Sequence, residues 1–265
     1  MEESVITSTQ NAKVKHVVAL QQKSALRRKE GLFVVEGRRE LMHCLEAGYE
    51  VVETFVLDEL NLDGLGKQDR LGITYRVSLQ VYEKMAYRGS TEGMMAVVRE
   101  KQLSLDDLQL GSAPLIMVLE RVEKPGNLGA VLRSADAAKA DAVIICDPLT
   151  DLYNPNLIRS SIGAVFSVPC VACSSEDCIA FLKARGIQIL TAQLQDSSLY
   201  YDTDMQRGTA IVMGTESTGL TDQWRQAADA HIRIPMLGQL DSLNVSVSAA
   251  ILLFEAVRQR QSAKF

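Results

Sequence analysis

The chain has 265 residues, of which 47% are hydrophobic and 23% charged, and its net charge is −5. These proportions are typical of soluble globular proteins and exclude a disordered or collagen-like chain, while the length suggests one large or two small domains. The most apolar stretch, residues 245–257, contains serines and a glutamate and is shorter than the roughly 20 apolar residues that a membrane span needs. The acidic N-terminus shows no apolar signal segment, so we expect a cytoplasmic protein without membrane contact.

Predicted strands and helices alternate along the first part of the chain. Residues 32–36 (LFVVE) predict a strand, and residues 38–47 predict a helix with one apolar face that ends at Gly48. Three further strands are predicted at 51–57, 73–77 and 94–98, and a helix is predicted near 79–87. Together they predict a compact α/β unit over residues 1–105.

A polar stretch at residues 99–114 is the best linker candidate, and a second unit is predicted over residues 106–265. Strands are predicted at 115–119, 142–146, 187–191, 209–213 and 230–234, and helices at 127–139, 155–161, 176–185, 221–228 and from about 244. Apolar strands alternating with helices favour a mostly parallel sheet covered on both faces. Ligands of such sheets bind beyond the carboxyl ends of the strands.

Charge differs between the two predicted units. Residues 1–105 carry 15 basic and 15 acidic side chains, and residues 106–265 carry 13 and 18. Within residues 10–40, eight basic residues stand against three acidic ones. This local excess fits contact with RNA phosphates, but it fits an ordinary solvated helix face as well.

The five cysteines predict buried core residues rather than a metal or redox site. Cys170 and Cys173 form a C-x-x-C pair with Cys178 nearby, whereas Cys44 and Cys146 lie in apolar surroundings. A zinc site would need a second ligand pair, and the three histidines are not at ligand spacing. We therefore expect no metal.

The first chemically informative loop covers residues 123–129 and follows a predicted strand. Its Pro-Gly pair predicts a turn, after which Asn127 is expected to cap a helix. Gly129 and Arg133 lie four residues apart, so the Arg133 side chain would reach back toward Asn127. The alternative for Arg133 is a surface salt bridge, for example with Asp136 or Asp141.

The second loop, residues 214–219, begins at Gly214 and ends at Gly219. Its glycine spacing is similar to that of a dinucleotide-binding loop, but Glu216 replaces the middle glycine and places a carboxylate where a pyrophosphate would bind. A nicotinamide or flavin dinucleotide is therefore not expected. The alternative is a simple turn bounded by glycines.

The third loop, residues 234–246, joins a strand to the last helix, for which Ser242 or Asn244 is a candidate cap. Its backbone groups could read the edge of an adenine. The helix that follows is apolar nearly all round, which predicts burial within one subunit or in a dimer interface.

Together the three loops resemble a known family. The motifs N-x-G-x-x-x-R-S-A from Asn127, G-x-E-x-x-G-L from Gly214 and I-P-M-x-G-x-x-x-S-L-N-V-S from Ile234 are similar to the three motifs of the SpoU/TrmH class of RNA ribose methyltransferases in the SPOUT superfamily. The resemblance covers about residues 115–260. Residues 33–37 and the helix that follows resemble the ribosomal-protein-like substrate-binding domain that often precedes this catalytic domain. Lys124 departs from the acidic residue of many relatives, which leaves the electrostatics of the first loop open.

The resemblance implies an N-terminal α/β/α RNA-binding domain followed by a C-terminal α/β knot domain with a deep trefoil knot. It also implies S-adenosylmethionine as the cofactor and an obligate homodimer. By position it assigns cofactor contacts to Gly214, Gly219, Ile234, Met236 and Leu243. The reaction site that it implies consists of Asn127, Arg133, Glu216, Ser242 and Asn244, some of them contributed across the dimer.

The implied reaction transfers a methyl group from a sulfonium to a ribose 2′-hydroxyl. Since arginine normally stays protonated, Arg133 would clamp the adjacent phosphate or stabilise the developing alkoxide, while the family proposal that it accepts the proton is a further option. Asn127 and Glu216 would orient Arg133. Ribosomal RNA is favoured over tRNA as the substrate because a separate substrate domain precedes the knot. Two alternatives stay open, a non-catalytic RNA-binding protein and an RNA base methyltransferase of the sister branch.

Overall fold

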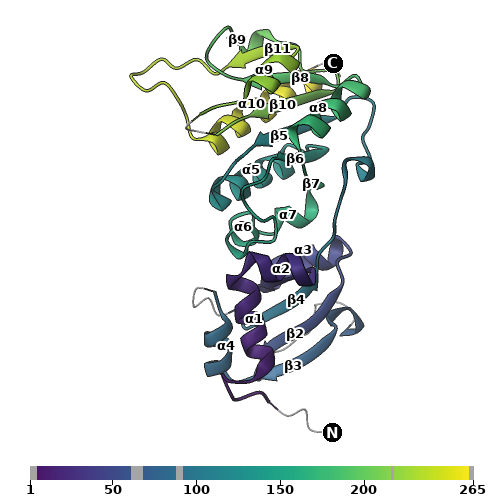
Figure 1. The fold of residues 1–265 in the computed structure, drawn as a ribbon, viewed down its shortest axis with the longest axis vertical. Coiled ribbons are helices and arrows are strands. Elements are labelled where there is room, and N and C mark those ends of the chain that lie inside the picture. The colour runs from purple at the N-terminus through teal and green to yellow at the C-terminus, as the bar shows by residue number, and fades with distance from the viewer. Residues whose placement is uncertain (1–4, 61–67, 88–91, 216–217, 263–265) are drawn as a thin grey trace. The chain divides into compact units, whose positions relative to one another are not determined.

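The computed structural model describes residues 5–60, 68–87, 92–215 and 218–262. The chain forms two compact units (Figure 1). The first consists of Met1–Lys101 with Asp151–Ser167, and the second consists of Gln102–Thr150 with Val168–Phe265.

The first unit contains a four-stranded sheet in the order β1-β4-β2-β3. Its strands are β1 (Leu32–Glu36), β2 (Val51–Leu57), β3 (Ile73–Val77) and β4 (Met94–Arg99). β4 is antiparallel to both neighbours, whereas β2 and β3 are parallel. The helical elements are α1 (Ala12–Gln22), α2 (Ser24–Glu30), α3 (Arg38–Glu46), η1 (Gln68–Leu71), α4 (Leu79–Met85), α6 (Pro155–Ser160) and α7 (Ala164–Ser167). α1 and α4 contact each other (Figure 1) and bury Val17, Leu20 and Tyr82 against Phe55 of the sheet.

The segment Asp151–Ser167 packs with the first unit, although the sequence placed it inside a continuous second domain. Aromatic and ionic contacts explain this packing. The ring of Phe33 stacks on that of Tyr153 with 4.2 Å between centroids. Arg27, which is buried, donates from Nε to Asp151 at 2.7 Å. Contacts between residues distant in sequence leave no local pattern in the sequence. A domain boundary predicted from the polar linker alone therefore could not include them.

The second unit contains a seven-stranded sheet in the order β7-β6-β5-β10-β8-β11-β9, and each strand is parallel to its neighbours. The strands are β5 (Leu115–Glu120), β6 (Ala142–Cys146), β7 (Cys170–Cys173), β8 (Gln188–Ala192), β9 (Ser198–Leu199), β10 (Thr209–Met213) and β11 (Ala230–Arg233). Every residue of β5, β6 and β10 is buried, as expected for a parallel sheet covered on both faces. The expected mostly parallel sheet is thus confirmed.

Helices cover this sheet in two groups. They are α5 (Pro125–Ala137), α8 (Ser175–Ala184), α9 (Asp222–Ala227) and α10 (Val245–Ser262), with short 3-10 turns η2 (Leu105–Asp107) and η3 (Tyr200–Asp202). α5 and α10 pack on each other, and α10 also contacts β5 and β10. Leu182 of α8 and Trp224 of α9 pack with Ile116, Val118 and Ile144 of the sheet. None of the helices in the described ranges is both long and apolar enough to span a membrane.

The chain leaves β11, runs through residues 234–244 and enters α10. A trefoil knot along this path stays a prediction.

Candidate active site

A cavity of about 400 Å³ lies where β8, β10 and β11 end, at the carboxyl edge of the parallel sheet. Its volume is within the range of small-molecule sites, and its place is where ligands bind in open α/β sheets. Met213, Leu220, Val245 and Leu252 form part of its apolar wall. The sequence predicted a ligand site beyond the carboxyl ends of the strands. Residues of the second and third loops both line the cavity found there.

The loop after β10 closes on itself beside the cavity. A Cβ atom added to Gly214 would lie 2.3 Å from the carbonyl carbon of Gly219, so only glycine permits this approach of the two backbone segments. Thr215 accepts the Gly219 N–H at 3.0 Å through its carbonyl, and its hydroxyl oxygen accepts the Thr218 N–H at 3.0 Å. Gly219 has a φ of +67°, a conformation that favours glycine. Glu216, the remaining candidate of this loop, lies outside the described residues.

A buried carboxylate fixes the point at which this loop leaves the cavity. Glu120, the last residue of β5, is 1% exposed, and its two oxygens accept the Thr221 N–H at 2.9 Å and the Thr221 hydroxyl at 2.6 Å. Nearby, Ser175 donates to Asp147 at 2.6 Å and accepts from the Trp224 indole at 3.0 Å. Glu120 was not among the sequence candidates. The available signal was an acidic residue at the end of the otherwise apolar strand LIMVLE.

The third loop joins α10 to α5 through two asparagines. Asn244 caps α10, since its Oδ1 accepts the Ser246 N–H at 3.0 Å. Its Nδ2 donates to Oδ1 of Asn127 at 3.2 Å. The structure thus brings together two residues that lie far apart in sequence, and it confirms Asn244 as a cap.

The expectation that Asn127 caps α5 is wrong. The helix starts earlier, at Pro125, with Lys124 as its N-cap. Proline suits the first helical position because its φ is already helical and its missing N–H would have no partner there. Asn127 lies in the first turn instead, where its side chain meets Asn244.

Most of the other predicted residues gather around the cavity. Those that line it are Gly214, Gly219, Ile234, Met236, Ser242 and Leu243. Ser242 is exposed, and its hydroxyl donates to Asp241 at 3.1 Å.

Arg133 lies apart from this group. It is exposed on α5 and does not line the cavity. The salt-bridge alternative for Arg133 stays a prediction, and within one chain Arg133 does not reach the cavity.

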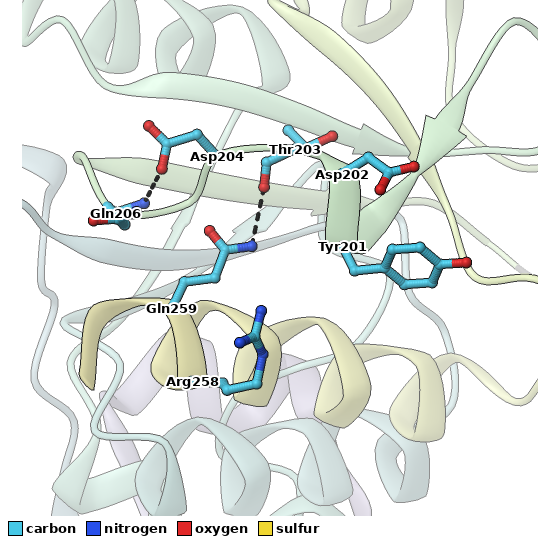
Figure 2. Close-up of a pocket in the computed structure, with 7 residues that line it drawn as sticks. All are labelled: Tyr201, Asp202, Thr203, Asp204, Gln206, Arg258 and Gln259. Atoms are coloured by element: carbon cyan, nitrogen blue, oxygen red, sulfur yellow. Dashed lines mark hydrogen bonds between the residues drawn. The ribbon is translucent and has the colours of Figure 1, made fainter. Parts of the chain in front are cut away.

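A second, more open depression of about 420 Å³ lies between the C-terminal half of α10 and residues 201–206. Figure 2 shows Gln259 reaching from α10 to the Thr203 carbonyl, to which it donates at 3.1 Å. Gln259 also accepts the Met205 N–H at 2.8 Å, so it holds this loop on the helix. Arg258 donates twice to Glu255 at 2.8 Å, and these hydrogen bonds lower the pKa of Glu255. These contacts account for the polar groups structurally, and we assign no ligand to the depression.

A fully parallel sheet with a cavity at its carboxyl edge defines an α/β ligand-binding or catalytic domain. Residues 114–254 match the SpoU rRNA Methylase family, and residues 11–96 match the MRM3-like substrate binding domain. The chain therefore belongs to the SpoU rRNA methylase family, as its three motifs indicated.

Similar proteins cover nearly the whole chain. The 23S rRNA (guanosine(2553)-2′-O)-methyltransferase RlmP of Bacillus subtilis is 30% identical, over 94% of this chain and 97% of its own length. A crystal structure of an RNA 2′-O ribose methyltransferase is 38% identical with a TM-score of 0.84, covering 97% of this chain and 100% of that one. The AdoMet-bound rRNA methyltransferase of Sinorhizobium meliloti is 28% identical with a TM-score of 0.89, covering 96% and 97%.

Proposed function

We propose that this protein is an S-adenosylmethionine-dependent methyltransferase that modifies a ribose 2′-hydroxyl of ribosomal RNA. The observation that carries this proposal is the cavity at the carboxyl ends of β8, β10 and β11, which is lined by the family's second and third motifs. Relatives over nearly the full length are named 23S rRNA 2′-O-methyltransferases, and AdoMet-bound structures are among the structural neighbours.

The cavity fits S-adenosylmethionine in size and chemistry. The loop after β10 offers backbone groups at Gly214 and Gly219, and its close packing would not tolerate a side chain at Gly214. Ile234, Met236 and Leu243 add apolar surface, which suits an adenine ring. We assign the cofactor contacts to these five residues. The cofactor supplies an electrophilic methyl group on its sulfonium.

Arg133 is assigned to the substrate side of the reaction. The methyl group would leave the sulfonium sulfur, which becomes a neutral thioether, and bond to the ribose 2′-oxygen, whose proton would pass to solvent water. Arg133 stays protonated, clamps the adjacent phosphate and stabilises the developing negative charge. Asn127 and Glu216 orient Arg133, and Ser242 and Asn244 line the place where the ribose binds.

We further assign completion of this site to a second copy of the chain. Arg133 is exposed and does not line the cavity of its own chain. The face of α10 that α5 does not cover carries Val247 and Phe254, each 47% exposed. Apolar side chains in such a row favour an interface. A homodimer through α10 would cover them and supply Arg133 in trans.

RNA binding is assigned to the first unit, which exposes Lys15 on α1, Arg28 and Lys29 on α2, and Lys23 between the two helices. Exposed lysine and arginine side chains neutralise phosphates and release their counterions. No step of this proposal uses a metal ion, and a cytoplasmic location stays a prediction.

The test is methyl transfer to unmodified ribosomal RNA by the purified protein with isotopically labelled S-adenosylmethionine. After complete nuclease digestion, mass spectrometry should find the label in a 2′-O-methylated nucleoside. Label on a base would indicate the sister branch of the superfamily. RNA binding without any transfer, over a range of RNA fragments, would contradict catalysis and favour a binding protein.

A further inference from the structure

Three cysteines meet at the carboxyl edge of the parallel sheet, outside the cofactor cavity. Cys146 and Cys173 are the last residues of the adjacent strands β6 and β7 and lie opposite each other in register. Cys178 reaches the same point from the first turns of α8. The three Sγ atoms all lie within 4.8 Å of one another.

Strand geometry explains why the C-x-x-C motif did not reveal this cluster. Cys170 and Cys173 are three residues apart in an extended strand, so their side chains point to opposite faces of the sheet. Cys170 lies opposite Val143 on the other face. The partner of Cys173 is therefore Cys146, which no sequence spacing connects to it.

We propose that Cys146, Cys173 and Cys178 bind one thiophilic divalent cation of the zinc class. Thiolates are the ligands that select zinc and its softer relatives over magnesium or calcium. Three sulfurs bound tetrahedrally to one zinc ion, each at about 2.3 Å, lie about 3.8 Å apart. Because the three Sγ atoms lie within 4.8 Å of one another, each sulfur–sulfur distance needs to shorten by at most about 1 Å to reach that spacing.

The surroundings suit a cation that enters from one side. Cys146 and Cys178 are fully buried, whereas Cys173 is only half-buried and leaves an edge of the cluster open to solvent. The carboxylates of Asp147 and Asp177 act electrostatically on Cys173 and favour a positive ion beside it. Three protein sulfurs leave a fourth tetrahedral position, which a water molecule can occupy at the open edge.

A bound ion would join the ends of β6 and β7 to the start of α8. Ser175, in the first turn of that helix, accepts from the Trp224 indole of α9. Because none of the three cysteines lines the cofactor cavity, the site would be structural, and its test needs no methyl transfer.

The experiment uses the full chain, reduced and stripped of metal, and adds zinc chloride or cadmium chloride. After gel filtration, elemental mass spectrometry should find one equivalent of bound ion, with ultraviolet absorption from cadmium–thiolate bonds. Binding should release protons and weaken as the pH falls, because the thiols must ionise. Cys173→Ser should weaken binding by more than the roughly 10–100-fold that loss of an outer-shell partner costs. Cys170→Ser, in the same strand but on the other face, is the matched control and should bind like the wild type.

Two results would overturn the site: no retained ion in the wild-type chain, or equal retention by the Cys173→Ser and Cys170→Ser variants. If Cys173→Ser does not fold, the wild-type chain still decides the question. Zinc should slow alkylation of Cys173 by iodoacetamide, followed by peptide mass spectrometry. An unchanged alkylation rate at Cys173 would contradict the proposal.

Discussion

The two units carry sheets of different kinds, and this difference determines where chemistry can gather. In the first unit β4 runs antiparallel to both neighbours, so it ends at the opposite edge of the sheet from β1 and β2. In the second unit all strands are parallel, so every strand-to-helix loop starts at one edge. The cofactor cavity and the cysteine cluster both lie at that edge. We therefore propose that the second unit carries the chemistry and that the first unit recognises substrate with its surface.

The surface of the first unit is less basic than its sequence indicates. Arg27 is 3% exposed and donates to Asp151 and to the carbonyl of Gln21. Lys13 pairs with Glu53, and this hydrogen bond raises the pKa of Lys13. Part of the positive charge therefore stabilises the fold, and only the exposed remainder is available for RNA.

The largest expected effect is the loss of turnover when Arg133 is replaced. Arg133→Ala should lower turnover by roughly 10²–10⁴, because it removes both the phosphate clamp and the stabiliser of the alkoxide. S-adenosylmethionine affinity, measured by calorimetry, and RNA affinity through the first unit should change little. Arg133→Lys retains the charge without the planar fork and should restore little activity. Near-full activity of the Ala variant would remove Arg133 from the reaction, and near-full activity of the Lys variant would show that charge alone suffices.

The next largest effect is expected from disrupting the proposed homodimer. Ala250, half-buried on α10, should lie in the proposed interface, where Ala250→Glu would bury an unpaired charge at a cost of about 3–5 kcal/mol. Analytical ultracentrifugation should then find monomers, and turnover should fall because Arg133 no longer reaches the partner's cavity. Gln261→Glu adds the same charge at an exposed position of the same helix and should leave the assembly unchanged. A fully dimeric Ala250→Glu variant would place the interface elsewhere.

Gly214→Ala tests whether the cavity depends on the close approach of two backbone segments. A Cβ at this position would lie 2.3 Å from the Gly219 backbone, so the loop must move. We expect S-adenosylmethionine affinity to fall by roughly 10–100-fold, the equivalent of about 1–3 kcal/mol. RNA affinity should not change. Gly111→Ala, where nothing lies within 4 Å of the added atom, is the control. Wild-type cofactor affinity in Gly214→Ala would show that this loop does not shape the site.

The parts of the site that the sequence predicted are those that are continuous in the chain. The loop that begins at Gly214 follows the buried strand β10, and the loop that begins at Ile234 follows the partly buried strand β11. A parallel sheet necessarily brings the starts of both loops to one edge. Contacts between distant segments were not predictable in this way. The Asn127–Asn244 hydrogen bond and the hydrogen bonds from Thr221 to Glu120 each join segments that lie far apart in the sequence.

The burial of individual charged side chains could not be predicted from the sequence either. A basic residue in a basic stretch gives no sign that it is buried, so Arg27 could not be separated from Arg28 by sequence. The helix start was missed for a local reason, since Pro125 and Asn127 are both favourable near a helix N-terminus and only the backbone decides between them.

Replacing the exposed basic residues of α2 and its N-cap tests the role of the first unit. The triple variant Lys23→Ala, Arg28→Ala, Lys29→Ala should weaken RNA binding by about tenfold at low salt, and the slope of log affinity against log salt should become shallower by up to about 2. Cofactor affinity should be unchanged. Lys183→Ala, exposed on α8 of the second unit, should have little effect on RNA binding. If affinity and slope both match the wild type, this basic surface is an ordinary solvated face.

The smallest effect on cofactor affinity is expected from a change at Thr221. This change tests whether the buried Glu120 carboxylate helps to position the loop that lines the cavity. Thr221→Val removes the 2.6 Å hydrogen bond to Glu120 but leaves the backbone N–H bond at 2.9 Å. The lost bond is to a carboxylate, so the free energy of unfolding should fall by about 1–3 kcal/mol, measured by urea denaturation. Because Thr221 directly follows the cofactor loop, S-adenosylmethionine affinity should fall a few-fold as well. Thr221→Ser keeps the hydroxyl and should restore most of both. A purely structural role would lower the stability of Thr221→Val with no change in cofactor affinity, and Glu120 would then support the sheet and not the site.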